Sequence, residues 1–184
     1  MALTPSNMAP LGTTAPDFKL PDGQGQEHTL KSIADENGIL VVFICNHCPF
    51  VKHIADFLEP LKQKLAELKI GMVAISANDI SDYPEDAPDK MAALSAEKGF
   101  TFPYLYDESQ AVAKSYGAAC TPDFFLYDQA LKLFYRGQLD DSRPGNGNPI
   151  TGKHLLEAAN AITSHTPYTA TQNPSVGCNI KWKE

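Results

Sequence analysis

The chain has 184 residues, of which 43% are hydrophobic and 20% charged, so size and composition are those of one ordinary globular domain. Its 22 acidic and 15 basic residues give a net charge of -7, which disfavours nucleic acid and anionic lipid as partners. No stretch approaches the roughly 18 consecutive apolar residues of a membrane span, and residues 1–14 lack the features of a secretory signal, so we expect a cytoplasmic protein without a membrane partner.

The first part of the chain is predicted to be an arm followed by a hairpin. Residues 1–14 contain prolines and small polar residues without periodicity, which indicates an irregular arm. Residues 15–20 alternate apolar and polar side chains, and a Pro-Asp-Gly turn cluster separates them from residues 27–30, so these two segments should pair as a β-hairpin. One helical turn is expected over residues 31–37.

A strand, a helix and a second strand form the predicted centre. Residues 39–44 are an apolar, β-branched run, typical of a strand buried on both faces. From residue 51 to residue 68 apolar side chains recur every three or four positions, which predicts one long helix. Residues 69–77 form a second buried strand, and because a helix connects the two strands, they should be parallel.

The second half continues the alternation of helices and strands. Its first predicted elements are a loop (81–89), a helix (90–98), an extended segment (102–107) and a short helix (108–116). Strands are predicted at residues 123–128 and 131–136, and since only two residues separate them, they must form an antiparallel hairpin. Residues 151–163 read as the last helix.

The expected organisation is therefore a single domain with two extensions. The arm covers residues 1–14, and the domain covers residues 15–163. Residues 164–184 are expected to form a tail that docks on the domain through Ile180 and Trp182, since apolar side chains favour burial over solvent.

Two cysteines, Cys45 and Cys48, stand in the sequence Cys-Asn-His-Cys-Pro between the buried strand and the long helix. Unpaired N–H groups and the helix dipole at a helix N-terminus stabilise a thiolate. We therefore expect Cys45 to be the attacking sulfur and Cys48, one turn further, to close a disulfide with it. Asn46 and His47 should tune the pair, because an imidazole can donate to the Cys45 thiolate or place a positive charge beside it.

Other roles for these cysteines are less favoured. Cys-x-x-Cys is also zinc-ligand spacing, but a closed zinc site needs two further ligands, usually on a second pair, and Cys120 and Cys178 stand alone. Two inert core cysteines are the other alternative. We expect redox chemistry with neither a metal nor a cofactor. Cys120 and Cys178 are possible auxiliary thiols in a relay, although single cysteines are more often small buried hydrophobes.

Three motifs together resemble the redoxin branch of the thioredoxin superfamily, which includes proteins grouped with the alkyl hydroperoxide reductase/thiol-specific antioxidant family. They are Ala15-Pro16-x-Phe18-x-Leu20, Cys45-x-x-Cys48-Pro49 and Cys120-Thr121-Pro122 with the strand that follows it. The resemblance runs from about residue 15 to residue 162, and the tail resembles an uncharacterised subgroup with the same Cys-Asn-His-Cys-Pro.

The resemblance implies an α/β thioredoxin fold, in which helices flank a mixed central sheet, extended here by the N-terminal β-hairpin. It also implies that Thr121 and Pro122 support the active site. In this family a cis proline faces the cysteine pair, and the backbone edge beside it pairs with the extended chain of the substrate.

The leading functional hypothesis is a thiol–disulfide oxidoreductase. Cys45 attacks a protein or small-molecule disulfide, Cys48 resolves the mixed disulfide, and an unidentified thiol reductant restores the pair. An antioxidant thiol peroxidase is the alternative. Placing the peroxiredoxin cysteine on Cys48 puts the expected proline at Val41, and the expected threonine and arginine are also missing, at Cys45 and near Pro122. A non-catalytic module that binds partner peptides is the third hypothesis.

Overall fold

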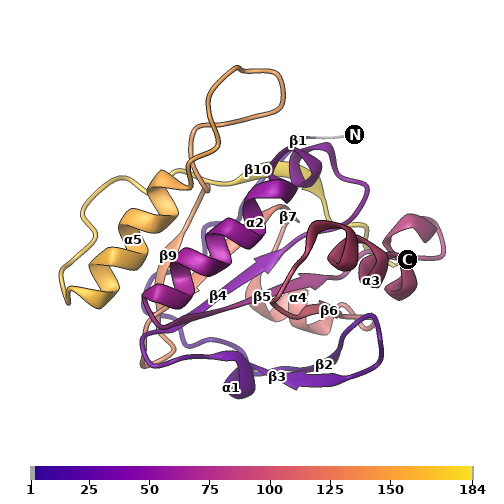
Figure 1. Cartoon of the computed structure of the whole chain (residues 1–184), viewed down its shortest axis with the longest axis horizontal. Helices are drawn as coiled ribbons and strands as arrows, with labels where there is room; N and C mark the ends of the chain where they lie inside the picture. The colour runs from indigo at the N-terminus through magenta and orange to yellow at the C-terminus, as the bar shows by residue number, and fades with distance from the viewer. Residues whose placement is uncertain (1–2, 184) are drawn as a thin grey trace.

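The computed structural model describes residues 3–183 (Figure 1). Its helices are α1 (Leu30–Ile33), α2 (Pro49–Glu67), α3 (Pro88–Lys98), α4 (Ala111–Tyr116) and α5 (Lys153–Thr163), with a 3₁₀ turn η1 (Pro84–Asp86). Its strands are β1 (Leu3–Pro5), β2 (Lys19–Pro21), β3 (Glu27–Thr29), β4 (Gly38–Phe43), β5 (Ile70–Ser76), β6 (Tyr104–Tyr106), β7 (Cys120–Thr121), β8 (Asp123–Tyr127), β9 (Leu133–Arg136) and β10 (Val176–Asn179).

The central sheet is mixed, and β4 lies in its middle. Its strand order is β6-β5-β4-β8-β9. The first three strands are parallel, and β8 runs antiparallel to both β4 and β9. The predicted α/β architecture, the parallel pair around the long helix and the antiparallel hairpin are therefore confirmed. The N-terminal hairpin is also present, as the two-stranded sheet β2-β3.

The two faces of β4 are buried in different cores, because successive side chains of a strand point to opposite faces. Leu40 and Val42 belong to the core that α2 and α5 cover, on the front of the sheet in Figure 1. Val41 and Phe43 belong to the opposite core, to which α4 contributes Tyr116. All six residues of β4 are buried, which explains the uninterrupted apolar run in the sequence.

Both ends of the chain meet in a second sheet beside the cysteines. Its order is β1-β10-β7, and both pairings are antiparallel. The prediction of an irregular arm is therefore wrong for Leu3–Pro5, which form β1; residues 1–2 lie outside the described part. A three-residue strand has no detectable periodicity, and its partner β10 is at the other end of the sequence. Of the two apolar side chains predicted to dock the tail, Ile180 is buried, whereas Trp182 is 40% exposed.

The segment predicted as a loop over residues 81–89 is more ordered than expected. It contains η1 and the start of α3, and Pro84 and Pro88 occupy early positions of these two elements. Proline favours such positions because its missing N–H has no partner there in any helix. This segment brings Asp86 to the cysteines.

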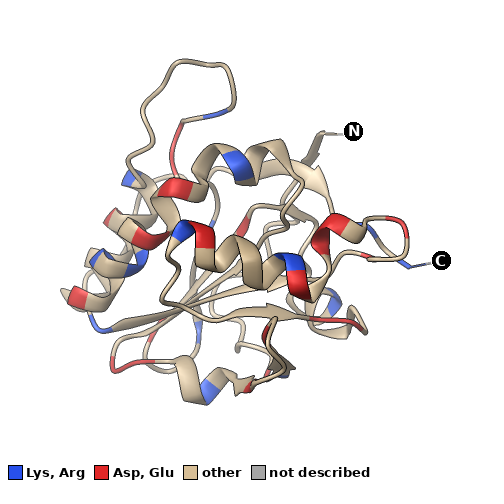
Figure 2. Ribbon diagram, turned by 45° about the vertical axis from the view of Figure 1, so that its right-hand side comes forward, with Lys and Arg blue, Asp and Glu red and all other residues tan. Residues whose placement is uncertain are grey.

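Acidic and basic residues are both scattered over the helices and loops, as Figure 2 shows. Among the helices that the structure describes, none is both long enough and apolar enough to cross a membrane.

Candidate active site

The two cysteines lie at the carboxyl end of β4, where the chain turns into α2. The N-cap residue of α2 is Cys48, and Pro49 is the first helical residue. Cys45 is 1% exposed and Cys48 is fully buried. A reaction with a substrate in solution therefore requires this part of the molecule to open.

Thr121, from the second half of the chain, contacts the sulfurs of both Cys45 and Cys48. Its hydroxyl oxygen lies 3.4 Å from the Cys45 Sγ, and its backbone carbonyl oxygen lies 3.1 Å from the Cys48 Sγ. The peptide bond between Thr121 and Pro122 is cis. The structure thus places together the cysteine pair and the Thr-Pro motif that the sequence suggested as their support.

Cys48 is the sulfur whose thiolate is favoured. Its pKa falls to about 4, chiefly because the Cys45 thiol donates a hydrogen bond to it; the Cys178 thiol, the Thr121 hydroxyl and the Val51 backbone in the first turn of α2 also favour the anion. Burial opposes this effect. The carbonyl of Thr121 opposes it too, because a protonated Cys48 can donate to that oxygen and a thiolate cannot.

The expectation that Cys45 is the attacking sulfur stays a prediction from the sequence. Donation to Cys48 raises the Cys45 pKa, and both burial and the nearby carboxylate of Asp86 raise it further. Because α2 begins at Pro49, Cys48 is its N-cap residue and Cys45 lies outside the helix.

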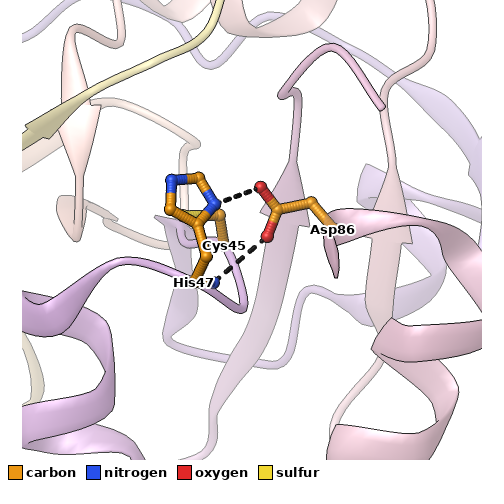
Figure 3. Close-up of side chains that lie close together, drawn as sticks. All are labelled: Cys45, His47 and Asp86. Atoms are coloured by element: carbon orange, nitrogen blue, oxygen red, sulfur yellow. Dashed lines mark hydrogen bonds and ion pairs between the residues drawn. The ribbon is translucent and has the colours of Figure 1, made fainter. Parts of the chain in front are cut away.

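Asp86 holds the loop between the cysteines and was not identified from the sequence. It is fully buried and accepts four hydrogen bonds. Its Oδ1 accepts from the backbone N–H groups of Asn46 (2.7 Å) and His47 (3.2 Å), and its Oδ2 accepts from the Asn78 amide (2.8 Å) and lies 2.7 Å from Nδ1 of His47. Figure 3 shows both carboxylate oxygens facing His47. No local pattern marks Asp86, which is one of several acids in a proline-containing loop.

His47 is oriented by this carboxylate. A carboxylate only accepts, so Nδ1 of the imidazole carries the proton that it donates to Asp86. The ring stacks on Tyr83 at 5.1 Å, and its Nε2 is buried without a hydrogen-bond partner among residues 3–183. Because Nδ1 is committed to Asp86, His47 does not donate to Cys45 through that nitrogen.

Two groups hold the side chain of Asn46 through hydrogen bonds. Its side-chain amide donates to the Glu85 carbonyl at 3.0 Å, and its side-chain oxygen accepts from the Tyr104 hydroxyl at 3.1 Å. Burial raises the Tyr104 pKa well above its ordinary value, so this hydroxyl stays a donor. The loop between the cysteines is therefore fixed through both of its middle residues.

Of the two single cysteines, only Cys178 approaches the pair. Its Sγ lies 2.9 Å from the Cys48 Sγ, and burial raises its pKa to about 12. Cys120 is also buried, but the closest contacts of its sulfur are backbone carbonyl oxygens, those of Pro122 (3.6 Å) and Ser175 (4.0 Å). Burial raises the Cys120 pKa as well.

Cys45, His47 and Asp86 each offer an atom that could ligate a metal ion, and these atoms lie within 4.8 Å of one another. The oxygens of Asp86 already accept four hydrogen bonds, so a metal would have to displace donors that fix the loop. We therefore interpret Asp86 as a hydrogen-bonding group. The absence of a metal stays a prediction from the sequence.

A small cavity of about 20 Å³, room for about one water molecule, adjoins the cis peptide. Pro122, His53, Ser142 and Arg143 are among the residues that line it. Nε2 of His53 and Oγ of Ser142 are buried and lack a hydrogen-bond partner among the described residues. The Arg143 guanidinium is held by uncharged oxygens, including the backbone carbonyl of Asp140 at 2.8 Å. The cavity thus offers polar atoms and a positive charge beside Pro122.

Two solved structures are similar to this chain over nearly its full length. An uncharacterised conserved protein from Geobacillus kaustophilus is 48% identical, with a TM-score of 0.97 over 100% of this chain and 97% of that one. A hypothetical protein from Sinorhizobium meliloti 1021 is also 48% identical, with a TM-score of 0.95 over 98% of each chain. More distant structures share the fold, among them a putative thiol:disulfide interchange protein DsbE from Chlorobium tepidum (19% identity, TM-score 0.64, 84% of this chain and 98% of that one).

Sequence relatives with assigned names are more distant. The thiol-disulfide oxidoreductase ResA of Geobacillus thermodenitrificans is 29% identical over 126 residues, which cover 67% of this chain and 66% of that protein. The chain thus spans slightly less than two thirds of that relative's length. Residues 11–136 match the AhpC/TSA family. This match covers more than half of the chain and includes the cysteine pair, Asp86 and the cis proline, so the protein belongs to the AhpC/TSA family and has a thioredoxin fold.

Proposed function

We propose that the protein is a thiol–disulfide oxidoreductase in which Cys48 is the attacking thiolate and Cys45 the resolving thiol. The observation that carries this proposal is the position of the two cysteines at the start of α2, where the Thr121 hydroxyl lies 3.4 Å from the Cys45 sulfur and the Thr121 carbonyl lies 3.1 Å from the Cys48 sulfur. The ResA relative, whose name states this activity, supports it. A thiolate at near-neutral pH is the form that exchanges with disulfides.

The proposed reaction has two steps. The Cys48 thiolate attacks one sulfur of the substrate disulfide, which forms a mixed disulfide and releases the other sulfur as a thiolate that takes up a proton. Cys45 then loses its proton and attacks Cys48, which forms the Cys45–Cys48 bond and releases the second substrate thiol. The substrate gains two electrons and the protein loses two; a thiol reductant reverses this change in the protein.

The substrate class we propose is a protein or small-molecule disulfide, and the named ResA relative supports a disulfide as the group that reacts. The cytoplasmic location remains a prediction from the sequence.

A thiol peroxidase is the second candidate, and the match of residues 11–136 to the AhpC/TSA family supports it. In that reaction the Cys48 thiolate attacks a peroxide oxygen, which gives a sulfenic acid and an alcohol or water. A neighbouring thiol then condenses with the sulfenic acid to a disulfide and releases water. The missing proline, threonine and arginine of the peroxiredoxin pattern make this the less favoured proposal.

Reduction of insulin by dithiothreitol, measured beside consumption of hydrogen peroxide, separates these candidates. We expect the wild-type protein to accelerate insulin reduction and Cys48→Ser to abolish the acceleration. Cys120→Ser is the matched control, because its thiol is equally buried but contacts carbonyl oxygens instead of another sulfur. Peroxide consumption without insulin reduction supports the peroxidase instead, and neither activity supports the peptide-binding module.

A further inference from the structure

The C-terminal strand β10 carries a third sulfur into the active site. Cys178 is only 3% exposed, and its Sγ lies 2.9 Å from the Cys48 Sγ. This separation is shorter than a normal non-bonded contact between sulfurs. Formation of a bond between the two therefore requires only a small movement of side chains, since a disulfide brings sulfur atoms to about 2.05 Å.

The backbone holds Cys178 in this position from two sides. β10 pairs with β7 so that Cys178 lies opposite Thr121, the residue whose carbonyl contacts Cys48. Gly177 makes this close approach possible, because a Cβ atom there would lie 2.0 Å from the Thr121 carbonyl oxygen. On its other edge β10 pairs with β1, where Cys178 lies opposite Leu3.

The segment after β10 is attached to the same hydrogen-bond network as the cysteine loop. The backbone N–H of Lys181 donates to the Asn78 side chain at 2.8 Å, and the Lys181 carbonyl accepts from Asp79 at 2.9 Å. Asn78 in turn donates to Asp86. The C-terminal strand is therefore fixed against both Cys48 and the loop that precedes it, and Cys178 is part of the site rather than of a separate core.

We propose that Cys178 is a second resolving thiol, which forms a disulfide with Cys48 and makes this sulfur the shared member of two alternative redox pairs. This inference rests on the proposed function and goes beyond it, because Cys-x-x-Cys chemistry requires only the two cysteines of the motif. It also assigns different roles to the two single cysteines, since Cys120 directs its sulfur to carbonyl oxygens.

The step balances without a further reactant. In the mixed disulfide, the Cys178 sulfur gives up its proton and attacks the Cys48 sulfur. A Cys48–Cys178 bond forms, the bond between Cys48 and the substrate breaks, and the leaving substrate thiolate takes the proton. Exchange with Cys45 then converts this bond to the Cys45–Cys48 disulfide and returns Cys178 to the thiol.

Oxidation with glutathione disulfide, followed by acid quenching, alkylation and tryptic mapping, tests the proposal. Cleavage after lysine and arginine places Cys45 and Cys48 in residues 32–52, Cys120 in residues 115–132 and Cys178 in residues 154–181. In Cys45→Ser we expect peptides 32–52 and 154–181 to be joined. Adding Cys178→Ser should abolish the joined species and replace it with glutathione bound to Cys48, whereas adding Cys120→Ser should leave it unchanged.

In the wild type we expect the same joined peptides beside the internal bond of peptide 32–52, so the test does not depend on the variants alone. A stable glutathione adduct on Cys48 in Cys45→Ser, with Cys178 fully alkylated in all proteins, overturns this inference and leaves the oxidoreductase function in place. A wild type in which none of these sulfurs oxidises, and which does not accelerate insulin reduction, overturns both.

Discussion

Nδ1 of His47 lies 2.7 Å from Oδ2 of Asp86, a carboxylate that is closed to solvent and that also accepts from the backbone of the loop between the cysteines. This contact joins the loop to a segment far along the chain and places a buried negative charge near Cys45. It therefore has both a structural and an electrostatic consequence.

The electrostatic consequence predicts that Asp86→Asn lowers the pKa of Cys45. The carboxylate opposes a second negative charge nearby, and the amide has a similar shape without that charge. In a Cys48→Ser background, a titration of thiolate absorbance at 240 nm against pH should show that Asp86→Asn lowers the pKa of Cys45 by about 1 unit. Asp82→Asn is the control, because Asp82 is an exposed acid of the same segment. An equal effect of both substitutions, or none, contradicts this account.

The low pKa of Cys48 predicts how the protein responds to loss of the Cys45 thiol. Cys45→Ala removes the main donor to the Cys48 sulfur, so the Cys48 pKa should rise from about 4 toward its ordinary range. Cys45→Ser keeps a donor in the same place and should keep most of the effect. Thiolate absorbance at 240 nm gives the measurement, with circular dichroism to verify folding at acid pH. A wild-type titration midpoint near 8 or 9 is incompatible with this assignment.

Asp123, at the start of β8, predicts a specific dependence of stability on pH. Burial raises its pKa from 3.8 to about 6. Because the folded-state pKa is raised, its contribution to stability is fully present below pH 3.8 and is lost as the pH rises through 6. A difference of roughly two units corresponds to about 3 kcal/mol.

We therefore expect the unfolding free energy of Asp123→Asn, relative to wild type, to increase by about 3 kcal/mol between pH 4 and pH 7. Urea unfolding at several pH values measures this difference. The control Asp82→Asn replaces an exposed acid, so the difference between its unfolding free energy and that of the wild type should change little with pH. A constant difference for Asp123→Asn as well shows that the residue titrates in its ordinary range.

Substitution of Gly177 by alanine should displace β10 and so test the role of this strand. In Gly177→Ala the added carbon would lie 2.0 Å from the Thr121 carbonyl oxygen, so the strand must shift away from β7. We expect a loss of about 1–3 kcal/mol in unfolding free energy, faster hydrogen exchange in β10, and less joining of Cys178 to Cys48 on oxidation. Val176→Ala, in the same strand, adds no atom near Thr121 and should preserve the joining. Wild-type levels of joining in Gly177→Ala contradict the proposed role of this strand.

Local patterns in the sequence were sufficient to predict the central strands of the fold and the long helix between them. The apolar run of β4 and the helical period of α2 report hydrogen bonding and burial between residues close in sequence, so the parallel pair around α2 and the place of Cys45 and Cys48 could be predicted. The Thr-Pro motif could be recognised only through the family resemblance. The short strand β1 gave no signal, because three residues show no period.

The chemistry of the site was decided by contacts between distant residues. Asp86 lies 40 positions after Asn46, and Cys178 lies 130 positions after Cys48. The pKa of a buried sulfur depends on every donor and charge around it, and these come from α2, η1, β7 and β10 together. The sequence by itself therefore determined which residues form the redox motif, whereas only the tertiary structure decided which groups surround each sulfur and which third sulfur reaches the pair, because those contacts join residues far apart in the chain.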